Sequence, residues 1–182
     1  MPRDWDTFYE SGGSLGDKPV FAVRAYEHLL PPGPVLDLAS GTGRNAIFLA
    51  SRGKQVLLVD ASASALEQAK KTAFSLGLVI KTQKYNLENG IPKNLYIYSA
   101  IIITYYLQRS LLNQISQYIR QGGMVIIEGY NKKEAKIRGR TQSPYYWEMG
   151  ELLLPTPGFK LMAGGEGHIR GHSRSWAVWV KQ

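Results

Sequence analysis

Short apolar runs alternate with helical patterns along most of this chain, and this alternation constrains the fold more than any other feature. Five runs bounded by Gly, Pro or Asn have the length and composition of buried strands: 34–39, 55–60, 79–85, 97–104 and 123–129. Amphipathic helices are expected at 44–52, 63–76 and 110–120. Strands joined by helices pair in parallel through right-handed crossovers. The pattern therefore predicts a doubly wound α/β sheet.

Helix-terminal residues support these boundaries. Ser64 and Glu67 have the spacing of a capping box at the start of the second helix, and Gly53 and Gly122 are positioned as C-terminal stops. A further helix precedes the first strand and is expected to end at the PPGP segment, 31–34.

The two regions after the fifth strand depart from the alternation. Segment 130–155 is polar, basic and aromatic, whereas 159–163 and 173–182 have the composition of two strands joined by a Gly-rich turn. A terminal antiparallel hairpin is therefore expected. His168 and His172 are predicted to be solvated residues of that turn, and His28 a solvated residue of the first helix.

Composition narrows the classes of chemistry. A chain of 182 residues has the size of one domain, 1–182. It contains no cysteine, which excludes disulfides, thiolate metal sites and a Cys nucleophile, and three histidines give little basis for a metal centre. Because no apolar run approaches the roughly 20 residues of a membrane span, a cytoplasmic protein is expected.

Positive charge is dispersed, apart from one basic run. The net charge is +8, and NKKEAKIRGR, 131–140, has five basic residues for one Glu134. We interpret this run either as a solvated, mobile loop or as a site that attracts an acidic ligand.

The stretch VLDLASGTGRNAIFLA, 35–50, combines the first strand, a glycine-rich turn and a helix. Gly41, Gly43 and Ala46 satisfy the G-x-G-x-x-A spacing of a dinucleotide site, and Asp60 follows at the distance of a ribose-binding acid. A nicotinamide-dependent oxidoreductase is one hypothesis from this motif, and the motif alone does not decide.

The alternation of strands and helices, the terminal hairpin and the run DLASGTG at 37–43 resemble the class I S-adenosylmethionine-dependent methyltransferases. The upstream WDTFY and the tail GEL…GGEG…W are similar to the small bacterial tellurite-resistance and thiopurine-type enzymes. This resemblance implies a Rossmann-like sheet of about seven strands, mostly parallel with a C-terminal antiparallel hairpin. It also implies S-adenosylmethionine as the methyl donor.

The resemblance assigns cofactor roles by position. Asp37 would anchor the loop or accept from the methionine ammonium, and Asp60 would accept from the ribose hydroxyls. Ala39 stands where the family has its first glycine. The expected cofactor-binding residues are Asp37, Ala39, Ser40, Gly41, Gly43, Arg44, Asn45, Asp60, Ala61, Ser62, Asn86, Leu87 and Thr104.

Acceptor-side residues are expected at the carboxyl ends of the fourth and fifth strands and in the segments able to cover them, which we interpret as N-terminal lid helices in 1–30 and a substrate-side cap in 130–155. Tyr105, Tyr106 and Glu128 are assigned catalytic positioning roles. The candidates for substrate contact are Trp5, Tyr9, Arg109, Tyr130, Arg140, Tyr145 and Tyr146.

The acceptor is constrained mainly by what the chain lacks. The fourth strand ends in TYYL instead of the [DNS]-P-P-[YFW] signature of adenine amino methyltransferases, and cytosine carbon methylation needs a Cys nucleophile. We therefore expect direct in-line methyl transfer to a small molecule, neutral or anionic, without a metal, by a monomer or homodimer that does not bind a membrane. RNA or protein methylation and a non-catalytic cofactor-binding regulatory subunit are the alternatives.

Overall fold

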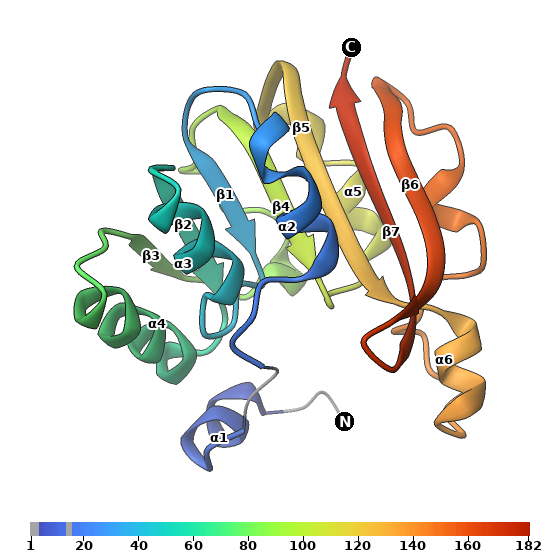
Figure 1. Ribbon diagram of the computed structural model, residues 1–182, viewed down its shortest axis with the longest axis horizontal. Helices are drawn as coiled ribbons and strands as arrows, with labels where there is room; N and C mark the ends of the chain where they lie inside the picture. The colour runs from blue at the N-terminus through green and yellow to red at the C-terminus, as the bar shows by residue number, and fades with distance from the viewer. Residues whose placement is uncertain (1–3, 14–15) are drawn as a thin grey trace.

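A twisted seven-stranded sheet with the order β3-β2-β1-β4-β5-β7-β6 forms the centre of the computed structural model, which describes residues 4–13 and 16–182 (Figure 1). The strands are β1 (Val35–Leu38), β2 (Val56–Asp60), β3 (Lys81–Lys84), β4 (Tyr98–Thr104), β5 (Ile119–Tyr130), β6 (Phe159–Ile169) and β7 (His172–Lys181). β1 to β5 pair in parallel, and β7 pairs antiparallel with both β5 and β6. The expected mostly parallel sheet with a terminal antiparallel hairpin is confirmed.

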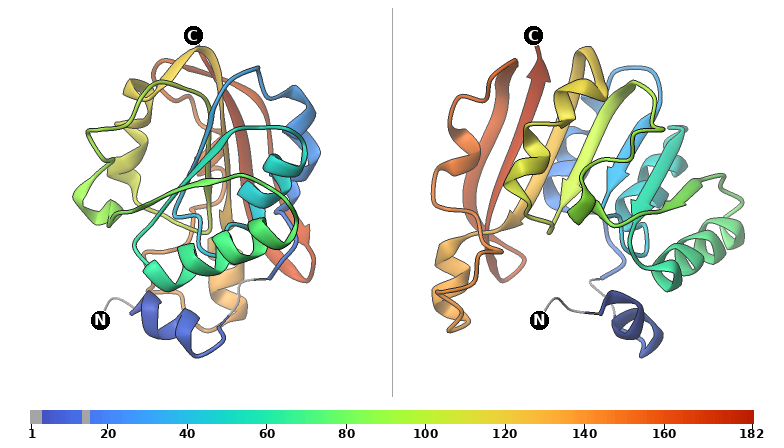
Figure 2. Two further views of the ribbon diagram at one scale, coloured as in Figure 1. Left: turned by 90° about the vertical axis from the view of Figure 1, so that its left-hand side faces the viewer. Right: turned by 180° about the vertical axis from the view of Figure 1, so that it is seen from behind.

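Helices cover both faces of this sheet (Figure 2). They are α1 (Trp5–Glu10), α2 (Phe21–Tyr26), α3 (Arg44–Ser51), α4 (Ala63–Ser75), α5 (Arg109–Leu112) and α6 (Lys132–Ile137), with 3-10 turns η1 (Glu27–Leu29), η2 (Leu87–Asn89), η3 (Ile115–Gln117) and η4 (Glu151–Leu153). Residues of α2, α3 and α4 pack on one face, and residues of η2, α5, η3 and η4 pack on the other.

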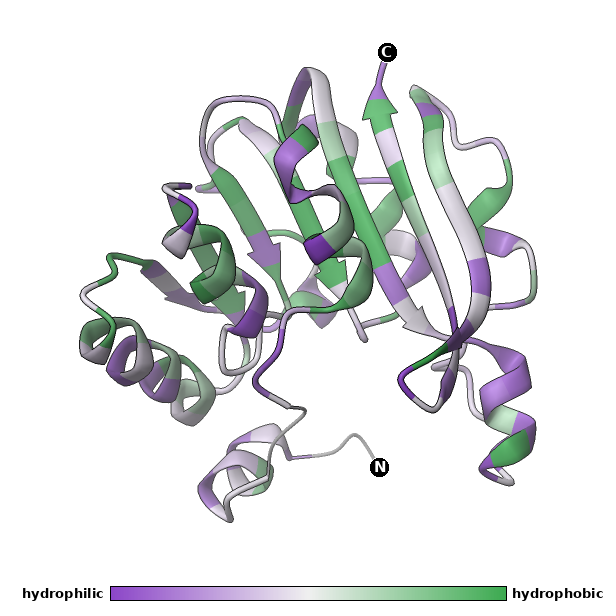
Figure 3. Ribbon diagram, in the orientation of Figure 1, coloured by the Kyte–Doolittle hydropathy of each residue, from purple (hydrophilic) through white to green (hydrophobic). Residues whose placement is uncertain are grey.

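The central strands are buried on both faces, which is why they read as continuous apolar runs. In β4, Ile101 and Ile103 join one core and Ala100 and Ile102 join the other, following the period of two along a strand. The hydropathy colouring shows this as green central strands flanked by helices in which hydrophilic and hydrophobic residues are mixed (Figure 3). Among the described helices, none has the length and apolar character that a membrane crossing requires.

The helix expected at 110–120 is wrong in extent. The chain forms only α5 and η3 there, and β5 already begins at Ile119, which pairs with Tyr98. Ile115 and Ile119 are buried as the periodicity predicts, but the Tyr98 amide donates to the Tyr118 carbonyl and draws the chain into the sheet. Gly122 is therefore a residue of β5, at an irregularity between the Tyr98 and Ala100 pairings, and it does not end a helix.

The capping box expected at Ser64 and Glu67 is also wrong, whereas the stop at Gly53 is confirmed. Ser62 is the N-cap of α4, and its hydroxyl accepts a hydrogen bond from the Ala65 amide. Gly53 follows α3 with a φ of 76° and donates to the Ala50 carbonyl.

The Gly-rich segment before the terminal strand is part of β6, and the turn consists of Arg170 and Gly171, both with positive φ. A Cβ on Gly164 would lie 2.6 Å from the Leu153 Cδ2, so glycine there lets η4 pack against the strand. His168 and His172 consequently lie in strands, which corrects their prediction as turn residues. His28, in η1, is exposed as expected.

The basic run at 131–140 contains the helix α6 and is not the loop that the first interpretation proposed. Its buried Glu134 accepts from the Ser173 amide at 2.8 Å and contacts Arg138 at 2.7 Å and His172 at 2.8 Å. Burial raises the pKa of Glu134, but these hydrogen bonds outweigh burial and lower it to about 2. The run is thus attached to β7 through an internal carboxylate.

A glycine pair tests how closely α3 and α4 must pack on the sheet. Gly43 and Gly53 have φ values of 77° and 76°, but a Cβ would lie 2.7 Å from the Leu58 Cδ2 at Gly43 and would meet nothing within 4 Å at Gly53. We expect Gly53→Ala to cost about 1 kcal/mol from backbone strain alone, and Gly43→Ala to cost roughly 3 kcal/mol because overpacking is added. Urea unfolding of both variants measures the difference, and equal losses would contradict the packing argument.

Candidate functional site

A cavity of about 300 Å³ opens where β1, β2 and β4 end, on the side of the sheet edge that faces α1. Its volume is at the lower end of the range of small-ligand pockets. The lining residues come from α1, from the loops after the strands and from η2: Asp4, Trp5, Asp6, Tyr9, Ala39, Asp60, Ala61, Ser62, Asn86, Leu87, Glu88, Thr104, Tyr105 and Tyr106.

The lining of this cavity is acidic although the chain is basic overall. Four carboxylates, those of Asp4, Asp6, Asp60 and Glu88, contribute to it, and no Lys or Arg is among the lining residues of the described chain. A negative lining favours a cationic ligand and disfavours the pyrophosphate of a dinucleotide. The electrostatics therefore count against the oxidoreductase hypothesis.

Asp60 is held in place by the glycine loop itself. Its Oδ2 accepts from the Gly41 amide at 2.7 Å, and its Oδ1 accepts from the Ser62 amide at 2.9 Å. Burial raises the pKa of Asp60, and the amides of Ser62 and Gly41 partly offset this. Because each carboxylate oxygen has a second acceptor position, Asp60 can still accept from ligand hydroxyls in the cavity.

The Asp37 carboxylate is fully buried at the end of β1. Within residues 4–13 and 16–182 neither of its oxygens has a hydrogen-bond partner, and the nearby Ser40 hydroxyl is also unpaired. Burial raises the pKa of Asp37 to about 7, although the positive charge of the Arg44 guanidinium lowers it in part. Unpaired buried polar groups are rare in folded proteins, and this acceptor suits a cation such as an ammonium group.

The loop between β1 and α3 has an unusual backbone. Gly41 and Ala39 both have a φ of 54°, a left-handed conformation that costs an alanine about 1 kcal/mol. The Tyr9 hydroxyl lies 2.6 Å from the position of a Cβ on Gly41, so glycine is required where the lid meets the loop.

Asn45 has a structural side chain. Its Oδ1 accepts from the Val20 amide at 3.0 Å, and its Nδ2 donates to the Thr104 hydroxyl at 2.9 Å. The segment before α2 is thereby fixed to the end of β4. Of the residues expected to bind the cofactor, Ala39, Asp60, Ala61, Ser62, Asn86, Leu87 and Thr104 line the cavity. Asp37, Ser40, Gly41, Gly43, Arg44 and Asn45 do not line it; they belong to the end of β1, its glycine loop and the start of α3.

Asn86 and Leu87 close the side of the cavity formed by η2. The Asn86 side chain accepts from the Glu88 amide at 3.0 Å and caps η2, and Leu87 is buried beside it. The apolar side chain of Leu87 is suited to contact one face of a planar heterocycle.

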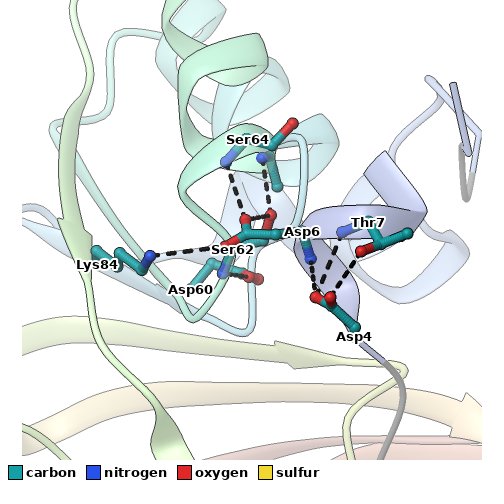
Figure 4. A network of polar contacts seen from close by, with 8 residues as sticks. Asp4, Asp6, Thr7, Asp60, Ser62, Ser64 and Lys84 are labelled. Carbon is teal, nitrogen blue, oxygen red and sulfur yellow. Dashed lines mark hydrogen bonds and ion pairs between the residues drawn. The ribbon is translucent and has the colours of Figure 1, made fainter. Parts of the chain in front are cut away.

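The helix α1 contributes residues to the cavity lining and is attached to α4 by polar contacts (Figure 4). Asp6 Oδ1 accepts from the Ser62 hydroxyl at 2.6 Å and from the Ser64 amide at 3.1 Å. Trp5 stacks on Tyr9 with ring centroids 6.2 Å apart. Asp4, Asp6 and Glu88 are lining residues that the sequence reasoning missed, and only the position of Asp4 and Asp6 beside Trp5 could have indicated two of them.

Tyr105 and Tyr106 form the end of the cavity beyond Thr104. The Tyr105 hydroxyl donates to the Glu128 Oε1 at 3.2 Å, and the Tyr106 hydroxyl donates to the Gln108 Oε1 at 2.5 Å. Burial raises the pKa of both phenols, to about 12 for Tyr106. Both hydroxyls are therefore protonated at neutral pH, so neither is a ready base for deprotonating an acceptor.

Three charged residues outside the cavity lining contact Tyr105: Glu128, Arg44 and Arg174. Glu128 is buried and accepts from the Ala22 amide, the Tyr105 hydroxyl and Arg174, so its two oxygens are occupied by protein donors. The guanidinium groups of Arg44 and Arg174 lie 4.9 Å and 5.3 Å from the Tyr105 ring centroid. Glu128 therefore lies outside the cavity lining, where its hydrogen bond can orient Tyr105.

The substrate candidates divide into two groups. Trp5 and Tyr9 line the cavity, whereas the others lie outside its lining. Arg109 forms a bidentate pair with Glu151 at 2.6 Å and 2.8 Å, and Tyr130 packs on Tyr105 with centroids 4.7 Å apart. Tyr146 is buried, and Tyr145 and Arg140 are exposed. In the described ranges no cluster of three or more His, Asp or Glu side chains is arranged to hold a metal ion.

Part of the chain matches a known protein family. Residues 35–123 match the family model described as a methyltransferase domain. The tRNA 5-carboxymethoxyuridine methyltransferase of Escherichia coli strain K12 is 32% identical over 106 residues, which cover 53% of this chain and 40% of that protein. The chain thus spans less than half the length of this curated relative.

Solved structures show the same fold. TehB from Haemophilus influenzae superposes with a TM-score of 0.75 at 18% identity, covering 96% of this chain and 66% of that one. The magnesium protoporphyrin IX methyltransferase ChlM from Synechocystis PCC 6803, with bound SAH, gives 0.67 at 18% identity, covering 87% and 78%. These structures share the fold of this chain, and residues 35–123 match a methyltransferase domain.

Asp37 allows a pH-dependent test of its unpaired state. A carboxyl whose pKa is about 7 in the folded chain and about 3.9 unfolded destabilises the fold increasingly as pH rises from 4 to 7. We expect the unliganded Asp37→Asn variant to melt about 2–4 °C above the parent at pH 4.5 and roughly 8–16 °C above it at pH 8, since three pKa units correspond to about 4 kcal/mol. Thermal unfolding across this pH range measures the difference; a constant offset would show that Asp37 already has a partner.

Proposed function

We propose that this chain, which carries a methyltransferase domain in a class I fold, is an enzyme that transfers the methyl group of S-adenosylmethionine directly to a small-molecule acceptor. The observation that carries the proposal is the acidic cavity with the unpaired, buried Asp37 behind it. A cofactor with a sulfonium and an ammonium group meets both requirements for positive charge, and a dinucleotide meets neither.

Different residues of the site would bind different parts of the cofactor. Asp37 would accept from the ammonium group, and Asp60 would accept from the ribose hydroxyls with the oxygen positions that Gly41 and Ser62 leave open. Asn86 and Leu87 would border the adenine. S-adenosylmethionine supplies a methyl group already activated by its sulfonium sulfur, so these residues have mainly to orient the cofactor and exclude water.

The acceptor end favours a nucleophile that is reactive without a strong base. Tyr105 and Tyr106 have raised pKa values, and Glu128 is occupied by three protein donors. A thiolate, a selenide or another soft anion has its lone pair free and needs no proton removed. Arg44 beside the Tyr105 ring would favour such an anion electrostatically, whereas Arg174 is already paired with the Glu128 carboxylate.

The cover over the cavity supports a small acceptor. Trp5 and Tyr9 of α1 lie on the lining, so the site has a closed side that a polymer would have to displace. We infer that α1 is the lid and that the segment 130–155, with α6, is the cap on the acceptor side.

RNA methylation is the second candidate, and two observations favour it. The curated relative from Escherichia coli is named for a modified tRNA uridine, and this chain has a net charge of +8. An RNA substrate would predict binding whose logarithmic affinity falls linearly with the logarithm of salt concentration. A regulatory subunit in the same fold would bind the cofactor and transfer no methyl group to any acceptor.

Cofactor binding is the first test. Isothermal titration should show S-adenosylhomocysteine binding to the parent chain and at least about tenfold weaker binding to Asp60→Ala, because the charge-assisted ribose hydrogen bonds are lost. Glu67→Ala removes an exposed carboxylate from α4 and should bind as the parent does. A parent chain that binds neither S-adenosylmethionine nor S-adenosylhomocysteine would refute the proposal.

The acceptor class is the second test. Methyl transfer from isotopically labelled S-adenosylmethionine should be faster to a thiol or hydrogen selenide than to bulk tRNA, and it should change little between 50 and 200 mM salt. Transfer to tRNA that declines steeply with salt would favour the RNA candidate, and the absence of transfer to every acceptor would favour the regulatory subunit.

A further inference from the structure

The helix α1, which we propose is the lid, makes contacts with another element that are not needed to form the helix itself. Asp4 is the N-cap of α1 and accepts from the amides of Asp6 and Thr7, so the helix has its cap without Asp6. Asp6 instead reaches another element. Its carboxylate lies at the N-terminus of α4, where it accepts from Ser62 and Ser64 and pairs with Lys84 at 3.6 Å.

The N-terminus of α4 is a favourable place for this carboxylate. The first amides of a helix lack intrahelical acceptors, and the helix dipole favours negative charge there. Ser62 is the N-cap and satisfies the Ala65 amide, which leaves the Ser64 amide for Asp6. The Ser62 and Ser64 hydrogen bonds, with the Lys84 pair, lower the pKa of Asp6, so the carboxylate is charged at neutral pH.

A second tether runs in the opposite direction. The side-chain amide of Gln68, in α4, donates through its Nε2 to the Tyr9 carbonyl near the end of α1, at 3.1 Å. Asp6 and Gln68 therefore attach α1 to α4 near both of its ends, which restricts rotation as well as separation. This matters for the cavity because Trp5, Asp6 and Tyr9 all belong to its lining.

The attachment point is also adjacent to the cofactor residues. Ser62 lies two positions after Asp60, and its amide donates to the Asp60 Oδ1 while its hydroxyl donates to Asp6. The same serine thus connects the lid to the acid expected at the ribose. Figure 4 shows Asp6, Ser62 and Asp60 in this arrangement, with Lys84 approaching from the side opposite α1.

We propose that Asp6 is a positioning residue that latches α1 over the cavity and thereby sets how long the cofactor and its demethylated product stay bound. The inference rests on the proposed cofactor and deepens it, because it assigns retention of the ligand to a contact between α1 and α4. Release of product then requires the Asp6 contacts to break, which makes α1 opening a step in each turnover.

The experiment compares Asp6→Asn with Glu67→Gln, the same carboxylate-to-amide change at an exposed position of α4 that contacts Lys70 and not α1. We expect Asp6→Asn to accelerate S-adenosylhomocysteine dissociation about tenfold in stopped-flow measurements, since two charge-assisted hydrogen bonds weaken. Glu67→Gln should leave the rate unchanged. Gln68→Ala, which removes the second tether, should accelerate dissociation about threefold to fivefold.

Amide hydrogen exchange measures how firmly Asp6 attaches α1 to α4, and it needs no ligand. In Asp6→Asn the amides of 5–10 and of Ser64 should exchange faster, while those of β1 and β4 stay as in the parent and the melting temperature changes by less than about 2 °C. Unchanged exchange in 5–10 would overturn the latch. Faster exchange with unchanged S-adenosylhomocysteine dissociation would overturn its role in retention.

These outcomes separate the latch from the proposed function. A parent chain without S-adenosylhomocysteine binding removes the proposed function and, with it, the role in retention, whereas the exchange result still decides whether Asp6 holds α1. Dissociation that is accelerated equally in Asp6→Asn and Glu67→Gln would also overturn the proposal, because it would reflect lost surface charge.

Discussion

The buried carboxylate of Glu128 joins the two halves of this molecule. It ends the parallel part of the sheet in β5, and it accepts from the Ala22 amide of α2, from the Tyr105 hydroxyl after β4 and from Arg174 of β7. A buried charge is stable only when its hydrogen-bonding positions are satisfied, so these elements are constrained to meet at one place. The orientation of Tyr105 at the cavity, and the approach of the antiparallel hairpin to it, both depend on that requirement.

The charge of the cavity lining is opposite in sign to the net charge of the chain. The chain carries a net charge of +8, yet the cavity lining has four carboxylates and the arginines near it lie behind Tyr105. In the proposed function, the acidic lining would attract a cationic cofactor, whereas the positive charge of Arg174 is already paired with Glu128.

Much of the fold was predictable because burial on both faces leaves a continuous apolar signature, as in 97–104 and 34–39. The helix expected at 110–120 failed because Ile115 and Ile119 have helical spacing, but a ladder bond from Tyr98, distant in sequence, competes for the same residues. The glycines of β6 lack a Cβ, and the backbone freedom that this gives suits a turn equally well. Asp6 was unpredictable for a related reason: its partners are more than fifty positions away, and no local pattern records them.

The two amide hydrogen bonds that hold Asp60 have an energetic consequence for binding. Gly41 and Ser62 belong to the protein, so the carboxylate has one orientation whether or not a ligand is bound. A flexible acid would lose side-chain entropy when it engaged ribose, typically about 0.5–1.5 kcal/mol, whereas this preorganised acid has already lost it on folding. The glycine turn therefore influences binding in the cavity through the fixed orientation of Asp60, a residue of the neighbouring strand.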